Sequence, residues 1–287
     1  MTATTLMGRT TSTATPGGTP ALVVVAHGSR DPRALRTVRA LLDRIRALRP
    51  GLPVRLGHIE LNAPLLPDTL AALGDGEAVL VPLLLSRGHH VTRDIPETAA
   101  VFPARTRVAA PLGPHPLLVD ALHDRLLEAG WPAHAGPDHA VVLAAAGSRA
   151  PESRTDTART AAALSARLGV PVLPAYASAA APTVPEAVRA LTARGHRRVA
   201  VAACFTAPGR FATECATAAT WIASAPLGIH PAMAHLLLHR YDQALGAEGE
   251  GNAPEGARGT ARQGARGTAR PATTYAAPAS GPHPAHA

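Results

Sequence analysis

The sequence contains no lysine, and all 28 of its basic residues are arginines. A P-loop ATPase is therefore excluded, because its phosphate-binding motif requires a lysine. Aromatic residues make up only 3% of the chain, too few to form stacking platforms for single-stranded nucleic acid. The net charge of +8 comes from arginines spread along the chain rather than from a basic run, so we expect no nucleic-acid partner. A large anionic small molecule remains compatible with this charge.

Cysteines and long apolar runs are also scarce. The two cysteines, Cys204 and Cys215, cannot form a disulfide framework or a multi-cysteine zinc site, which favours a reducing cytoplasm. No apolar run approaches the roughly 18 to 20 residues that cross a bilayer, so we expect no membrane span. The threonine-rich N-terminus lacks the basic start and apolar stretch of a secretory signal.

The length of 287 residues allows two domains between ends of low complexity. Residues 1–19 indicate a disordered leader. Residues 247–287, with the near-duplicate stretches 255–262 and 263–270, indicate a disordered tail. Between these ends we place a first domain at 20–131, a linker at 132–137 and a second domain at 138–246.

Strands and helices alternate along the first domain. Continuous apolar runs such as Ala21–Ala26 are typical of strands buried on both faces. Asp31 is a good N-cap for the first helix, and Asp94 and Glu97 have the spacing of a capping box. The predicted elements are strands at 21–26, 54–61, 78–85 and 107–110, and helices at 32–48, 64–73, 94–100 and 116–129. Such β-α-β units predict a parallel sheet flanked by helices.

The same series of landmarks then begins again. His27-Gly-Ser-Arg30 matches Ala146-Gly-Ser-Arg149, and four further landmarks recur in order, at offsets of 119, 118, 118, 121 and 115 residues. This regularity predicts an internal duplication. The predicted fold class is therefore α/β, with two similar domains that each contain a parallel sheet flanked by helices.

Three potential metal ligands follow successive strands of the first domain. His27 follows the first strand, Glu60 ends the second, and His90 follows the third. The carboxyl ends of parallel strands meet at one edge of a sheet, where ligands bind. Two imidazoles and a carboxylate there suit a divalent metal, and Glu60 is also a candidate base. The second domain has Ala146, Ser178 and Phe211 at the corresponding positions, which favours function over packing for the three ligands.

Several neighbouring residues have a simpler interpretation than chemistry. Ser29 has no nucleophile-elbow motif around it, so a turn or cap role is expected. A single glycine, Gly88, indicates turn geometry rather than a phosphate cradle. Asp94 is expected to cap its helix, Cys204 and Cys215 to be inert buried thiols, and His115 and His230 to pack at helix starts.

The segments Val25–Pro32 and Gly88–Pro96, together with Glu60, resemble the sirohydrochlorin chelatase family in its small, ATP-independent class II form. The resemblance covers residues 20–246 and implies a two-domain member with a degenerate second half. The family's metal-site histidines would fall on His27 and His90, with the glutamate at Glu60. A second histidine, His89, occupies the variable position of the motif and leaves its register open by one residue.

The resemblance implies insertion of Co²⁺ or Fe²⁺ into sirohydrochlorin by a monomer. The metal is then a substrate, and no tightly bound cofactor is expected. His27, His90 and Glu60 would hold the metal and accept the pyrrole protons. The anionic rim of the macrocycle would be bound by residues near the strand ends, namely Ser29, Arg30, Arg87, Gly88, His89 and Arg93, with Arg149 and Arg210 from the second domain.

Two other functions stay open: a non-catalytic metal or tetrapyrrole carrier on the same fold, and a hydrolase that activates water with the same ligands. The hydrolase lacks a second metal site and a nucleophile motif. Cobalt, iron and nickel all stay open as the metal, as do siroheme and cobalamin biosynthesis as the pathway.

Overall fold

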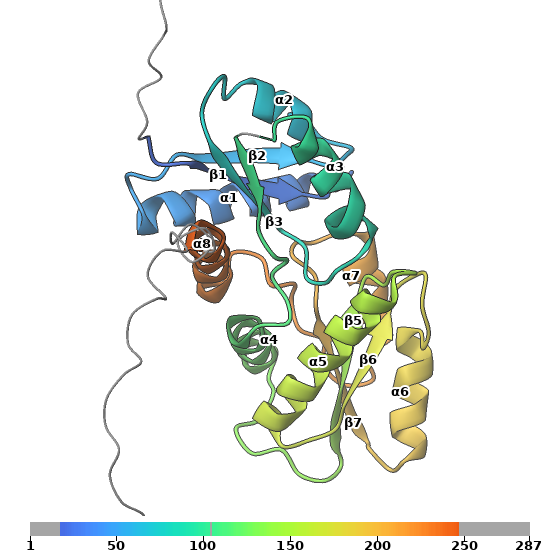
Figure 1. Ribbon diagram of the computed structural model, residues 1–287. Coiled ribbons are helices and arrows are strands. Elements are labelled where there is room, and N and C mark those ends of the chain that lie inside the picture. Colours follow the sequence, from blue (N-terminus) through green and yellow to red (C-terminus); the bar gives the residue numbers. More distant parts are fainter. Residues whose placement is uncertain (1–17, 104, 247–287) are drawn as a thin grey trace, which may run out of the picture. The chain divides into compact units, whose positions relative to one another are not determined.

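The computed structural model describes residues 18–103 and 105–246, all within one compact unit (Figure 1). The predicted tail and residues 1–17 of the predicted leader lie outside the described residues. None of the described helices is long and apolar enough to cross a membrane.

The first half of the chain contains a four-stranded parallel sheet with the order β2-β1-β3-β4. Its elements are β1 (Ala21–Ala26), α1 (Pro32–Leu48), β2 (Val54–His58), α2 (Leu66–Ala71), β3 (Ala78–Pro82), the π-helix η1 (His90–Asp94), α3 (Ile95–Ala100), β4 (Thr106–Val108) and α4 (Pro116–Glu128).

The second half repeats this plan. Its parallel sheet has the order β6-β5-β7, and Ala223 forms a parallel bridge with Val201 of β7 on the side where β4 pairs with β3 in the first sheet. Its elements are β5 (His139–Ala145), α5 (Pro151–Leu168), β6 (Val172–Tyr176), α6 (Val184–Ala193), β7 (Arg198–Ala203), α7 (Arg210–Thr217) and α8 (Pro231–Gly246). The predicted fold class is confirmed.

Several predicted elements prove shorter in the structure. The predicted strand 54–61 ends at His58, because the chain turns beyond it and Leu61 adopts a φ of +65°. The predicted strand 78–85 ends at Pro82, and the predicted helix 64–73 is reduced to α2. Strand β1 and helix α1 match their predictions, and Asp31 caps α1 by accepting a hydrogen bond from the Arg33 backbone N–H at 2.9 Å.

Each sheet buries both of its faces, as the continuous apolar strands require. Leu22 and Val24 of β1 share one core with Val141 and Leu143 of β5, and residues of α1, α4 and α8 pack into the same core. The opposite faces have separate cores, one with α2 and α3 and the other with α6 and α7. The two halves are therefore joined through the inner faces of their sheets.

The last helix of each half packs against the other half (Figure 1). Helix α4 contacts α5 and β7, whereas α8 contacts α1 and β3, and the two helices also contact each other. The buried Tyr241 of α8 donates a hydrogen bond to the Pro20 carbonyl at 2.6 Å, and Arg49 binds Asp242 through two hydrogen bonds of 2.6 and 2.7 Å. The boundaries placed at residues 131 and 138 stay a prediction, and the structure adds this exchange of helices across them.

The turn after the first strand has the same geometry in both halves. Gly28 and Gly147 have φ values of +104° and +91°, and a Cβ at either would lie 1.9 Å from a carbonyl oxygen, of Glu60 or Ser178 respectively. The hydroxyl of Ser29 accepts a hydrogen bond from the Asp31 backbone N–H at 3.1 Å, which confirms its predicted turn role. Only glycine allows the backbone to approach this closely with positive φ.

The helix-start histidines also behave as predicted. The Nδ1 atoms of His115 and His230 accept hydrogen bonds from the backbone N–H groups of Leu117 and Ala232, at 3.1 and 3.2 Å. Both rings therefore serve as N-caps of α4 and α8.

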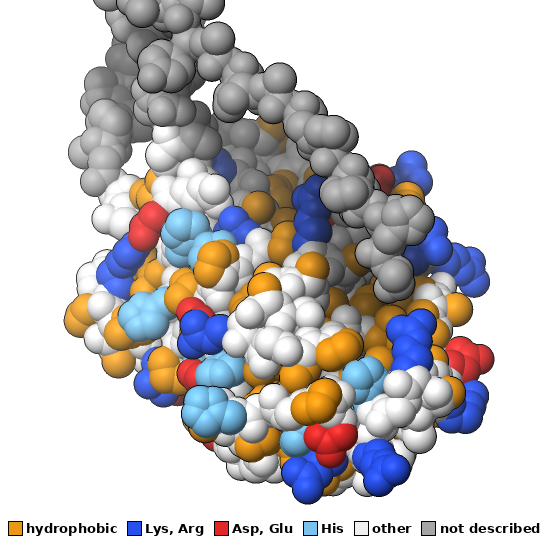
Figure 2. All heavy atoms as spheres, turned by 90° about the horizontal axis from the view of Figure 1, so that it is seen from below, with side chains coloured by type: hydrophobic (Ala, Val, Ile, Leu, Met, Phe, Trp, Pro, Cys, Tyr) orange, Lys and Arg blue, Asp and Glu red, His pale blue; other side chains and the backbone are white. Residues whose placement is uncertain are grey.

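The face of the molecule seen in Figure 2 has no single block of positive charge. Arginine side chains lie scattered there among hydrophobic, histidine and acidic side chains. Nucleic-acid binding depends on a basic patch or stripe, and this face does not provide one.

We predict that Gly28→Ala destabilises the protein much more than Gly130→Ala. Both glycines have positive φ, +104° and +99°, but a Cβ at Gly130 would meet nothing within 4 Å. Gly130→Ala should therefore cost only the backbone strain, about 1–3 kcal/mol. Gly28→Ala should cost about 1–3 kcal/mol more, because its methyl group displaces the Glu60 carbonyl. The measurement is the free energy of unfolding in urea. Equal losses in the two variants would show that the close approach at Gly28 is unimportant.

Candidate metal-insertion site

The three predicted ligands lie at one edge of the first sheet. His27 directly follows β1, Glu60 lies two residues beyond the end of β2, and His90 opens the π-helix after β3. Backbone hydrogen bonds continue past the strand ends, with Ile59 N–H donating to Ala26 O at 2.9 Å and Glu60 N–H to His27 O at 3.0 Å. This pairing holds His27 and Glu60 opposite each other.

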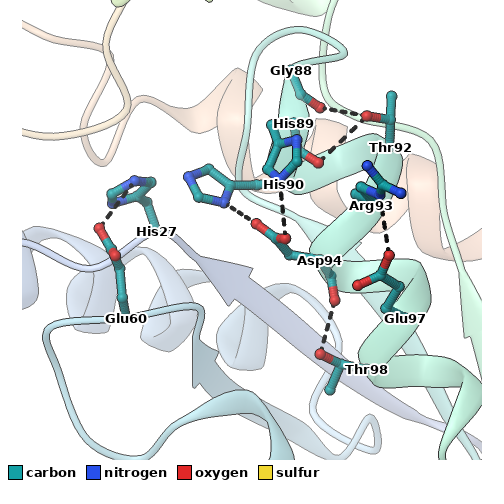
Figure 3. Close-up of polar contacts among 10 residues, drawn as sticks. All are labelled: His27, Glu60, Gly88, His89, His90, Thr92, Arg93, Asp94, Glu97 and Thr98. Atoms are coloured by element: carbon teal, nitrogen blue, oxygen red, sulfur yellow. Dashed lines mark hydrogen bonds and ion pairs between the residues drawn. The ribbon is translucent and has the colours of Figure 1, made fainter.

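The two histidine rings lie next to each other, edge to face, across a short gap (Figure 3). The centroids of His27 and His90 are 4.7 Å apart, with 79° between the ring planes. The Nε2 atom of His27 lies 3.5 Å from a Glu60 carboxylate oxygen, and its Nδ1 lies 3.2 Å from the Gly28 carbonyl. In the neutral tautomer that donates from Nδ1 to this carbonyl, the lone pair is on Nε2, beside Glu60.

Asp94 holds His90 rather than capping a helix. Its carboxylate accepts a hydrogen bond from His90 Nδ1 at 2.5 Å (Figure 3). The predicted capping box of Asp94 and Glu97 is therefore wrong. The π-helix runs directly into α3, so Asp94 has helical backbone angles, and its side chain makes no cap hydrogen bond. A carboxylate on Nδ1 directs the His90 lone pair to Nε2, the atom left free for a metal.

The structure places the two adjacent histidines differently. The His90 side chain is 33% exposed and meets His27, whereas His89 is 66% exposed and lies 3.5 Å from the other oxygen of Asp94. His90 is therefore the partner of His27. His58, two residues before Glu60, is buried with Nδ1 on the Pro64 carbonyl, and burial lowers its pKa. His58 thus supports the strand end as a neutral side chain.

The contacts among the ligands are pairwise. In residues 18–103 and 105–246, no group of three or more His, Cys, Asp or Glu side chains is arranged to hold a metal ion. Glu60 lies beside His27, and Asp94 is hydrogen-bonded to His90. The joint metal site of His27, His90 and Glu60 stays a prediction. What the geometry provides is a pair of facing imidazoles, each with a carboxylate beside it.

A cleft of about 1500 Å³ opens at the strand ends of both sheets. Ligand pockets usually measure roughly 300–1,000 Å³, so this cleft suits a large ligand. Eight of the predicted site residues line it, namely His27, Ser29, Arg30, Glu60, Gly88, His89 and His90 of the first half and Arg210 of the second. The second half contributes Ala146, Ser178, Phe205, Arg210 and Phe211.

Three predicted substrate-binding arginines, Arg87, Arg93 and Arg149, are not among the lining residues. Arg93 is 68% exposed and pairs with Glu97. Arg87 binds Asp156 of α5 through its guanidinium and its backbone N–H. Burial raises the pKa of Asp156, but the hydrogen bonds from Arg87 outweigh burial and hold that pKa below its usual value.

Asp94 and Asp156 are the residues that sequence reasoning missed. Asp94 lies four residues after His90, a spacing that places two side chains on one helical face. That signal was available, and the capping-box pattern obscured it. Asp156 carried no such signal, because its partner is 69 residues away in the other half of the chain.

The second half has no counterpart of the ligand pairs. Its Ser178 hydroxyl donates to the Ala146 carbonyl at 3.0 Å, and Arg210 stacks over the Phe211 ring at 4.8 Å. Both cysteines are buried, and burial raises the pKa of Cys204 to about 12 and that of Cys215 to about 11. Their prediction as buried thiols is confirmed, and their inertness stays a prediction.

The duplicated parallel α/β fold, with two histidines in one wall of a cleft, is the fold of the class II chelatases. The CbiX family model matches residues 21–129 and again residues 140–244, so the chain belongs to the CbiX family. The predicted internal duplication is confirmed by this double match.

Individual relatives are sirohydrochlorin chelatases. The sirohydrochlorin cobaltochelatase of Methanococcus maripaludis is 34% identical over 29% of this chain and 59% of its own length. The sirohydrochlorin ferrochelatase of Priestia megaterium is 26% identical over 80% of this chain and 92% of its own length. The structure of SirB from Bacillus subtilis with Fe³⁺ matches with a TM-score of 0.67 and 24% identity, over 80% of this chain and 98% of that one. The match thus spans less than two thirds of the first of these relatives.

We predict that Asp94→Ala weakens Co²⁺ binding by about 10- to 100-fold, the usual cost of losing the carboxylate behind a metal-bound histidine. Without Asp94, the His90 ring loses both its fixed orientation and its fixed tautomer. Glu97→Ala is the matched control, since Glu97 is an exposed carboxylate one turn further on that pairs with Arg93. The measurement is a Co²⁺ titration followed by visible absorbance. An unchanged affinity in Asp94→Ala would contradict the assignment.

Proposed function

We propose that this protein inserts Co²⁺ or Fe²⁺ into sirohydrochlorin without ATP. The observation that carries this proposal is the pair of facing imidazoles, 4.7 Å apart, in the wall of a cleft large enough for a tetrapyrrole. Membership of the CbiX family and the names of the relatives point to the same substrates.

The residues divide the reaction between holding the metal and moving protons. His27 and His90 can each offer a lone pair on Nε2, and two such ligands would bind a divalent transition metal weakly. Metal insertion releases protons from the pyrrole nitrogens, and Glu60 is a carboxylate beside His27 that is 51% exposed and can accept them. A metal held by few protein ligands is transferred readily to four macrocycle nitrogens. The metal acts as a substrate in this scheme, and no resident cofactor is required.

The opposite wall of the cleft suits the flat face of the macrocycle. Phe205 and Phe211 of the second half lie in this wall, where Phe211 replaces His90 of the first half. An aromatic ring packs against a tetrapyrrole but offers no lone pair to a metal. The asymmetry of the two walls thus presents the metal to one face of the ring.

We further propose that the chain acts as a monomer in the cytoplasm. One chain supplies both walls of the cleft, so no second copy is needed to complete it. Its two cysteines are free thiols, as expected in a reducing compartment.

The direct test is the absorbance of sirohydrochlorin mixed with purified protein and Co²⁺ or Fe²⁺, without ATP. The wild-type protein should accelerate the spectral change of metal insertion over many turnovers. His27→Ala and His90→Ala should each abolish the acceleration, whereas His89→Ala should retain most of it. Stoichiometric binding of metal or tetrapyrrole without turnover would identify a carrier instead.

Arg30→Ala should raise the KM for sirohydrochlorin about tenfold and leave kcat nearly unchanged. Arg30 is exposed in the cleft wall, and a contact to a substrate carboxylate is made equally in the ground and transition states. Arg93→Ala is the control, because Arg93 is not among the lining residues. Steady-state kinetics measure both. A larger effect from Arg93 than from Arg30 would place the substrate rim elsewhere.

A further inference from the structure

The loop that carries His90 is held by the second half of the chain. Residues 83–89 connect β3 to the π-helix. The hydroxyls of Ser86 and Ser153 lie 2.8 Å apart, and a Cβ on Gly88 would contact the Ser148 hydroxyl at 3.4 Å. The loop therefore rests against the start of α5 and the turn before it.

The strongest of these contacts joins Arg87 to Asp156. The Asp156 carboxylate accepts three hydrogen bonds, from the Arg87 backbone N–H at 2.9 Å, from Nε at 2.9 Å and from Nη2 at 2.7 Å. The bond to the backbone N–H fixes the main chain three residues before His90, and the two guanidinium bonds hold the buried carboxylate in the position that this bond requires. A side-chain ion pair alone would leave that main chain free to shift.

The Asp156 carboxylate is buried, and Arg87 is its charged partner. The Asp156 side chain is 1% exposed, and Ser153, one helical turn earlier, is also buried. A carboxylate this buried is stable only when it is paired and hydrogen-bonded. Arg87 supplies the pairing, and its hydrogen bonds keep the pKa of Asp156 low enough for the carboxylate to stay ionised at neutral pH.

The contact exists in only one of the two repeats. The residues of α1 that correspond to Ser153 and Asp156 are Ala34 and Thr37, and the residue that corresponds to Arg87 is Pro208. The second half, which lacks the metal ligands, thus has two residues, Ser153 and Asp156, that bind the loop after β3. The first half has no such residues at the corresponding positions.

We propose that Asp156 is a positioning residue, which fixes the loop after β3 so that His90 faces His27. The second half then contributes to the metal site through the backbone of Arg87, although it provides no ligand itself. The inference rests on the proposed function only in taking the metal held by His27 and His90 as a substrate. A metal site tolerates errors of about 0.5 Å in its ligands, so even a small shift of this loop would weaken it.

The test is a Co²⁺ titration of the full-length protein without tetrapyrrole, comparing Arg87→Lys with Arg49→Lys. Arg49 is a matched control, because it also forms a two-bond ion pair across the halves, to Asp242, and is not among the residues that line the cleft. Lysine keeps the charge but loses the two-pronged guanidinium geometry. Arg87→Lys should weaken Co²⁺ binding about tenfold, and Arg49→Lys should leave it unchanged.

Asp156→Asn provides a second variant, and it should weaken Co²⁺ binding at least as much as Arg87→Lys. Asp156→Glu, which retains the carboxylate, should restore part of the affinity. If Asp156→Asn does not fold, the comparison of the two lysine variants still decides the matter. Melting temperatures of all variants separate loss of metal affinity from loss of stability.

Three outcomes would overturn the inference. The first is equal Co²⁺ affinity in Arg87→Lys and Arg49→Lys. The second is a raised KM for sirohydrochlorin in Arg87→Lys with unchanged Co²⁺ affinity, which would make Arg87 a substrate contact. The third is a wild-type protein that binds no Co²⁺. A wild type that binds Co²⁺ with the expected variant effects but does not turn over sirohydrochlorin would refute the proposed function and leave this inference standing.

Discussion

The close approach of the Gly28 backbone to the Glu60 carbonyl is the constraint on which the site depends. It forces β1 and β2 to stay hydrogen-bonded beyond their last sheet residues, as the bond from Glu60 N–H to the His27 carbonyl shows. A histidine and a glutamate that are 33 positions apart in the sequence are thereby set side by side. The same approach recurs between Gly147 and Ser178. The turn is thus a property of the fold, and only the first half has potential metal ligands, His27 and Glu60, beside it.

Much of the fold could be predicted from local pattern. The apolar run predicts β1 because a strand buried on both faces needs apolar residues throughout. The Asp31-Pro32 pair predicts the start of α1 because Asp31 caps the first helical turn. The repeated landmarks predicted the duplication, and the strand ends predicted His27 and Glu60 as neighbours. The exchange of α4 and α8 could not be predicted, since an apolar helix face does not specify which sheet it covers.

The two acidic residues that sequence reasoning missed have a common physical origin. The capping box requires Asp94 to stand outside the helix, but the π-helix from His90 continues into α3 and turns the carboxylate toward the imidazole. Arg87 was expected at the substrate because it follows a strand end. Its partner in the structure, Asp156, becomes visible only when the two halves are packed together. In both cases the partner of the acidic side chain depends on an unusual local winding or on tertiary contact.

The exchange of α4 and α8 also determines how the protein responds to stress. Each half lacks the helix that would complete its own core, and the inner faces of both sheets share one core. Neither half can melt while the other stays intact, because the departing half would take a helix of the remaining half with it. A chain built from two similar repeats should therefore unfold as a single cooperative unit, with one transition in calorimetry. A backbone cut between residues 131 and 138 would leave the two fragments interlocked rather than free.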